Sequence, residues 1–86
     1  MNYTLAVFRS RFATLNFANL LRANNIPVAI INTPPHIGSA CGISVKFLSD
    51  YFSKVQAIGD RRGGFANFVG FFSMSQNAAG SVRPIR

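Results

Sequence analysis

The order in which two kinds of apolar spacing follow one another constrains the fold of this chain more than any other feature. Strict alternation of side chains predicts a strand, and apolar residues spaced three or four apart predict a helix. Alternation predicts strands at 3–8 and 43–47, and helical spacing is present at 13–21 and 51–58. A short β-branched run predicts a strand at 28–31, and a run that is apolar on both faces predicts the last one at about 65–72. The predicted order is therefore β-α-β-β-α-β.

Residues that favour helix ends flank both helical patterns. Ser10 and Ser49 stand where each helix begins, and a serine hydroxyl at this position accepts a hydrogen bond from a free backbone N–H. Asn24 and Asn25 can adopt the left-handed turn that ends a helix, and Gly59 can do the same for the second helix. We expect the helices to lie between these residues.

A chain with this order and right-handed crossovers folds most simply as a ferredoxin-like α+β domain. Its sheet has four antiparallel strands, and both helices cover one face. We expect this single domain to span residues 1–73. Residues 74–86 are rich in Ser, Asn, Ala and Gly and end in Arg-Pro-Ile-Arg, so we expect a flexible basic tail.

This topology predicts which segments meet at one end of the sheet. The first and second strands run parallel with the third between them, so the loop before the third strand lies beside the start of the first helix. The turn that enters the last strand lies at the same end. We therefore expect one group of neighbours there, formed by Ser10, Arg11, Cys41, Arg61 and Arg62.

Charge and composition exclude several kinds of chemistry. Nine Lys and Arg residues face only Asp50 and Asp60, giving a net charge of +7. Such a chain is attracted to nucleic acid, acidic protein surfaces or anionic lipid. Two Asp residues cannot supply a carboxylate pair for glycoside hydrolysis or a cage for magnesium or calcium. One Cys and one His make neither a disulfide nor a zinc cluster, so we expect no metal and no cofactor.

The same features predict where the protein works. A single free thiol suits a reducing compartment. The first apolar run has no basic residues before it and is interrupted by Arg9 and Arg11, so it is read as a strand rather than a signal peptide. No apolar stretch reaches the roughly 18 residues of a membrane span. We expect a cytoplasmic protein.

The sulfur of Cys41 is the candidate reactive atom. Cys41 precedes Gly42 in a loop of small residues, and glycine lets the backbone approach a ligand or a partner closely. A helix N-terminus and nearby guanidinium groups lower the pKa of a thiol below its usual value of about 8.5 and favour the reactive thiolate. The predicted topology brings the start of the first helix and the guanidinium groups of Arg11, Arg61 and Arg62 to this loop, where we expect them to stabilise the thiolate. The alternative is a buried, unreactive cysteine.

Two other segments near this loop have a functional and an ordinary interpretation. His36 can act as a base or a cation beside the thiol, or be an exposed loop histidine. The turn Arg61-Arg62-Gly63-Gly64 can bind an anion through backbone N–H groups and two guanidinium groups, or be a solvated turn. It lacks the spacing of a nucleotide-binding phosphate loop.

From Leu5 to Phe47 the chain resembles the small selenium/sulfur carrier-like domains of bacteria. The resemblance depends on Phe8-x-Ser10, Leu20-Leu21, Asn25-Ile26-Pro27-Val28, Ile31-x-Thr33-Pro34 and Ile37-x-Ser39-x-Cys41-Gly42-Ile43-x-Val45-x-Phe47. It implies that Cys41, with Ser39 and Gly42 in the same motif, accepts sulfur or selenium as a persulfide-type group and passes it on. It also implies a cysteine desulfurase as donor and an acceptor protein. The chain would then be a carrier rather than an enzyme.

Two further functions remain open. RNA-recognition domains share this fold class and stack bases on sheet aromatics, and the +7 charge suits a nucleic-acid or ribonucleoprotein partner. The run 64–71 approaches their strand signature, but Asn67 is an additional residue, and the third strand has Ile43 and Val45 where aromatics are needed. The other function is a structural subunit or homodimer that uses an uncovered sheet face.

Overall fold

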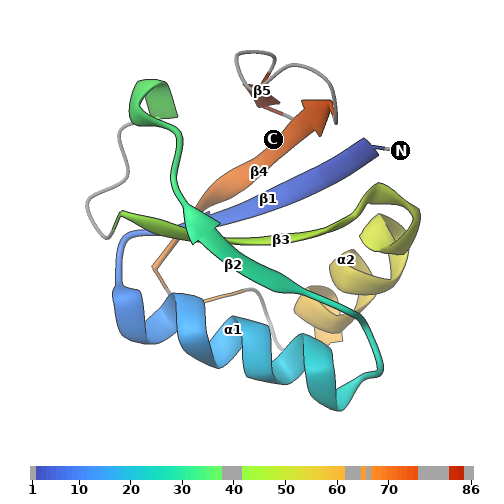
Figure 1. Cartoon of the computed structure of the whole chain (residues 1–86). Coiled ribbons are helices and arrows are strands. Elements are labelled where there is room, and N and C mark those ends of the chain that lie inside the picture. The colour runs from blue at the N-terminus through green and yellow to red at the C-terminus, as the bar shows by residue number, and fades with distance from the viewer. Residues whose placement is uncertain (1, 38–41, 62–64, 66, 76–81, 85–86) are drawn as a thin grey trace.

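The structure is a computed structural model that describes residues 2–37, 42–61, 65, 67–75 and 82–84 of the 86 (Figure 1). Its elements, in chain order, are β1 (Asn2–Phe8), α1 (Arg11–Ala23), β2 (Ala29–Asn32), the short 3₁₀ helix η1 (Pro35–Ile37), β3 (Ile43–Leu48), the 3₁₀ turn η2 (Ser49–Tyr51), α2 (Phe52–Arg61), β4 (Phe68–Ser75) and β5 (Val82–Pro84). The predicted order of four strands and two helices is confirmed.

The sheet is antiparallel throughout, in the order β2-β3-β1-β4-β5. Its first four strands have the predicted ferredoxin-like arrangement, with β1 in the centre. Tyr3 of β1 pairs with Leu48 of β3 on one side and with Met74 of β4 on the other. Strand β5 is an addition, because it lies within the segment expected to be a tail and pairs with β4.

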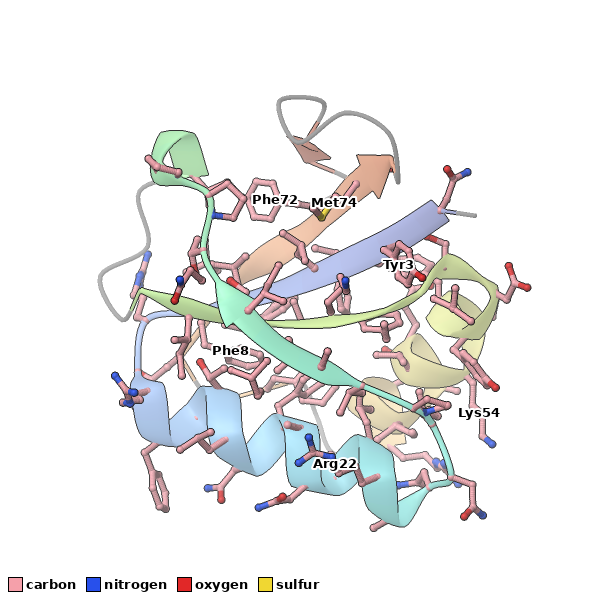
Figure 2. The ribbon with its side chains drawn as sticks, in the orientation of Figure 1. Tyr3, Phe8, Arg22, Lys54, Phe72 and Met74 are labelled. Atoms are coloured by element: carbon pink, nitrogen blue, oxygen red, sulfur yellow. The ribbon has the colours of Figure 1, made fainter. Side chains whose placement is uncertain are left out.

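Both helices cover one face of the sheet, and the core lies between the helices and that face (Figure 1). Alternation along β1 directs Ala6 and Phe8 toward this face, and Figure 2 shows Phe8 between the sheet and α1. The buried core is completed by apolar residues of both helices, of the segment after α1 and of β3 and β4: Phe17, Ala18, Leu21, Ile26, Val45, Phe47, Val55, Ile58 and Phe71.

Phenylalanine rings form the part of the core nearest the start of α1. The ring of Phe8 lies 5.0 Å from that of Phe17 and 5.2 Å from that of Phe68, measured between centroids. Phe65 meets Phe17 edge-on at 4.7 Å, and Phe68 meets Phe71 at 4.8 Å. These tilted and edge-on contacts are the favoured geometries of aromatic pairs. The aromatic run at 65–71 is therefore core packing.

The opposite face of the sheet carries a second set of apolar side chains. Leu5 and Val7 point away from the helices by strand alternation, and both are fully buried. Figure 2 shows Tyr3, Phe72 and Met74 on this face. The Nζ atom of Lys46 lies 4.6 Å from the centre of the Tyr3 ring, a distance at which the cation is attracted to the ring face.

Two predicted helix boundaries of α2 are wrong, for identifiable reasons. Ser49 is not an N-cap, because it is the first residue of η2 and its hydroxyl shares a 2.9 Å hydrogen bond with the hydroxyl of Thr4 in the central strand. Gly59 does not end the helix, because α2 continues to Arg61. Instead, Gly59 is where the ring of Phe65 approaches the helix, since a Cβ at residue 59 would lie 2.7 Å from Phe65 Cε2.

The last core strand begins at Phe68 rather than near residue 65. Asn67 adopts a left-handed backbone conformation with φ of 59°, which a strand does not accommodate. The pairing of β4 with β1 is also irregular just beyond this point, since Phe8 pairs with Phe68 but Val7 pairs with Gly70. Asn67, the additional residue seen in the sequence, is thus a turn residue before the strand, and the bulge follows it between Phe68 and Gly70.

Candidate functional site at one end of the sheet

Helix α1 begins with the predicted cap. Ser10 is extended (φ −117°, ψ 131°), and its Oγ accepts a hydrogen bond of 3.2 Å from the backbone N–H of Ala13. The carbonyl of Ser10 accepts two more hydrogen bonds, from the backbone N–H and the hydroxyl of Thr14, each 3.0 Å long. Arg11, the first helical residue, is exposed. The first turn of α1 is therefore fixed by hydrogen bonds, and it carries the exposed guanidinium group of Arg11.

The start of β3 lies at the same end, since Val7 near the end of β1 pairs with Ser44. The backbone N–H of Thr33 donates to the carbonyl of Gly42 over 2.9 Å. The hydroxyls of Thr33 and Ser44 share a hydrogen bond of 2.6 Å, and Ser44 is fully buried. These two bonds fix Gly42, the residue that follows Cys41 in the chain, next to the end of β2.

Gly42 is required for its backbone rather than for space. Its φ is +76°, a region that L side chains rarely adopt, and among the described residues that are not its chain neighbours no heavy atom lies within 4 Å of where a Cβ would stand. We expect Gly42→Ala to lower the free energy of unfolding by about 1 kcal/mol through backbone strain alone. Gly42→Asn should lower it by less, because asparagine tolerates this conformation. Urea unfolding of the two variants measures the difference, and equal losses would contradict the assignment.

The start of β4 completes this end of the sheet. The backbone N–H of Arg9 donates to the carbonyl of Asn67 over 2.8 Å, so β4 begins beside the link between β1 and α1. The predicted meeting of three connections is therefore found for the described parts of each: the start of α1, the start of β3 and the start of β4.

One predicted member of this group lies elsewhere. Arg61 is exposed and is the last residue of α2, and Figure 1 shows α2 ending below the middle of the sheet, away from the first turn of α1.

Several predicted site residues fall in the two loops before β3 and after α2. Those that lie outside the described residues are Ser39, Cys41, Arg62, Gly63 and Gly64. The backbone of His36 belongs to η1, which follows the end of β2, and its side chain is outside the described part. The site therefore consists, as far as it is described, of Ser10, Arg11 and Gly42 with the bonds that hold them.

The sequence interpretation missed an apolar surface at the start of α1. Phe12 is 74% exposed and Leu15 is 44% exposed, and the third exposed large hydrophobic residue of the described ranges, Val69, lies at the start of β4. The signal was present, because Phe12 lies five positions before the buried Phe17. Two residues five positions apart point about 140° away from each other around the helix axis, so Phe12 cannot belong to the buried stripe that includes Phe17.

Fold and site together define a small ferredoxin-like domain with a basic and apolar surface where its first helix begins. The chain belongs to the family described as "Putative Se/S carrier protein-like", whose model matches residues 2–63. That range includes β1 through α2 and the whole segment between β2 and β3. No curated protein and no solved structure matches the chain. Within the described ranges, neither helix is long and apolar enough to cross a membrane.

Proposed function

We propose that this protein carries sulfur or selenium on the thiol of Cys41 and passes it from a donor protein to an acceptor protein. The observation that carries the proposal is membership of the selenium/sulfur carrier-like family over a range that includes Cys41 and Gly42. The fixed first turn of α1 and the glycine backbone at residue 42 support it, because both lie at the end of the sheet where β3 begins.

The proposed transfer is an exchange between sulfur atoms. The Cys41 thiolate attacks the outer sulfur of a persulfide on the donor, such as a cysteine desulfurase. The donor S–S bond breaks, the donor cysteine leaves as a thiolate, and Cys41 holds the outer sulfur as a new persulfide. One S–S bond forms and one breaks, so no separate oxidant or reductant is needed. An acceptor thiolate then attacks the outer sulfur on Cys41 in the same way, and selenium can take the place of that outer atom.

The surroundings proposed for the thiol favour its charged form. The N-terminus of a helix carries a partial positive charge, and a nearby guanidinium group also stabilises a thiolate. The first turn of α1 and the exposed Arg11 are the described groups that would supply this charge. In this proposal Arg11 assists the thiol electrostatically, while the left-handed backbone of Gly42 sets the direction in which the chain enters β3 directly after Cys41.

Loading of Cys41 tests the proposed function directly. Incubation of the full chain with a cysteine desulfurase and free cysteine should add one sulfur atom to the intact mass, and a reducing agent should remove it. Cys41→Ser should gain nothing under the same conditions. A wild-type chain whose mass does not change overturns the carrier role.

The pH dependence of alkylation provides the second measurement. A thiolate is the reacting form, so a thiol pKa below the usual value of about 8.5 predicts rapid reaction with iodoacetamide near neutral pH. We expect Arg11→Gln to move the midpoint of the reaction to higher pH. A thiol that reacts only above that pH, or only in the unfolded chain, would show that Cys41 is not activated.

A further inference from the structure

The start of α1 exposes an apolar pair between two arginines. Phe12 and Leu15 are three positions apart, so their side chains are neighbours on the helix surface, and Arg11 is four positions before Leu15. Arg9 stands in the link that precedes the helix, and both arginines are exposed. We call this surface, formed by Arg9, Arg11, Phe12 and Leu15, the α1 patch.

Exposure of the α1 patch needs a reason, because apolar residues elsewhere in the described chain are mostly covered. A phenylalanine that is 74% exposed in the first turn of a helix gains nothing from the core. Large exposed apolar side chains that cluster and are rimmed by charge mark interaction sites. Phenylalanine and arginine are also enriched at protein interfaces, where buried anchors contribute most of the binding free energy.

The charges of the α1 patch select the kind of partner. The patch has two arginines and no carboxylate. Asp50 lies in η2, beyond the opposite end of β3, and Asp60 lies in α2. A second copy of the chain docked patch to patch would bring four arginines together without any acid, which is repulsive. A partner with an apolar pocket surrounded by acidic residues complements the patch, because the pocket matches its apolar pair and the acidic rim matches its two arginines.

We propose that the α1 patch docks the sulfur donor protein, with Phe12 filling an apolar pocket whose rim carries Asp or Glu residues. This inference rests on the proposed function, and it names where the donor binds. The patch lies on the turn of α1 that is fixed by the Ser10 cap, at the end of the sheet where Gly42 precedes β3. A donor docked on the α1 patch would lie at the end of the sheet where β3 begins. The proposed transfer needs the donor at that end, because Cys41 directly precedes Gly42 in the sequence.

The experiment compares two donors that load the same thiol. A cysteine desulfurase must dock on the chain, whereas inorganic polysulfide needs no docking surface. We expect Phe12→Ala to lower kcat/KM for loading by the desulfurase about tenfold or more, as loss of an interface anchor does. Loading by polysulfide should stay within about twofold of wild type.

A matched charge reversal tests the arginine part of the α1 patch. Arg9→Glu should slow loading by the desulfurase, and rising salt should slow the wild type in the same assay, because attraction between opposite charges is screened. Lys54→Glu changes the net charge by the same amount on α2, where Figure 2 shows the side chain directed outward, and should have little effect.

The outcomes separate the two proposals. If neither donor loads the wild-type chain, the carrier role fails and the docking role fails with it. If both donors load it but Phe12→Ala and Arg9→Glu load at wild-type rates from the desulfurase, only the docking role is overturned. Binding of single-stranded RNA gives the third outcome. If Phe12→Ala and Arg9→Glu weaken RNA binding but leave loading by the desulfurase unchanged, the α1 patch binds nucleic acid and the docking role is overturned.

Discussion

Phe8→Ala is expected to lower the free energy of unfolding by about 3–5 kcal/mol, the range found when a buried phenylalanine is truncated. Phe8 is 1% exposed and contacts the rings of Phe17, Phe65 and Phe68. Removing its ring leaves a cavity between the central strand and α1 that its aromatic neighbours cannot fill without moving. A domain of this size has a total stability of roughly 4–13 kcal/mol, so the loss is a large share of it.

Phe12→Ala is the matched control for this prediction. The same atoms are removed four positions further along the chain, but the Phe12 side chain is 74% exposed and outside the core. Surface substitutions of this kind change stability by about 0.5 kcal/mol or less. Urea unfolding followed by circular dichroism measures both variants. Comparable losses in the two would mean that the ring of Phe8 does not support the core as described.

Gly59→Ala is expected to destabilise the domain by about 1 kcal/mol, against the ordinary preference of helices for alanine. Alanine is favoured over glycine inside a helix by about 1 kcal/mol. At residue 59, however, the added Cβ would lie 2.7 Å from Cε2 and 2.8 Å from Cζ of Phe65. Phe65 cannot turn aside freely because it also meets Phe17 and Phe68 edge-on. Forcing additional volume into such packing costs about 1–3 kcal/mol, and the helix preference for alanine offsets about 1 kcal/mol of that cost.

A double-mutant cycle isolates this contact. In a chain that already carries Phe65→Ala, the ring that blocks residue 59 is absent, so Gly59→Ala should become stabilising by up to about 1 kcal/mol. Thermal or urea unfolding of the four chains measures the change of sign. Equal destabilisation in both backgrounds would show that the cost lies in the helix backbone and not in the approach of Phe65.

The sequence predicted the order of elements because each segment has a clear period. Alternation along 3–8 and 43–47 and the stripe around Phe17 and Leu21 leave little choice of element type, and handedness then determines the sheet order. What it could not predict depends on contacts between distant residues. Ser49 looks like a cap until Thr4 is found across the sheet. Gly59 looks like a helix end until Phe65 is found against it.

The candidate site was predictable to a similar degree. Topology correctly brought Ser10 and the start of β3 to one end of the sheet, because parallel first and second strands require it. The position of Arg61 depends on the length of α2, which local pattern defines poorly. The exposure of Phe12 was visible as a departure from helical periodicity, but an apolar side chain in an amphipathic pattern is readily assigned to the core without a structure.

The central position of β1 determines when folding can be completed. Strand β1 is synthesised before its partners at 43–48 and 68–75, and Tyr3 pairs with Met74, which lies 71 residues further along the sequence. Contacts so distant in sequence require large loops to close first, which slows folding relative to domains built from local contacts. During synthesis β1 therefore keeps one edge unpaired until residues 68–75 have emerged. A chain that stops after α2 would present that apolar edge permanently, ready to pair with another strand.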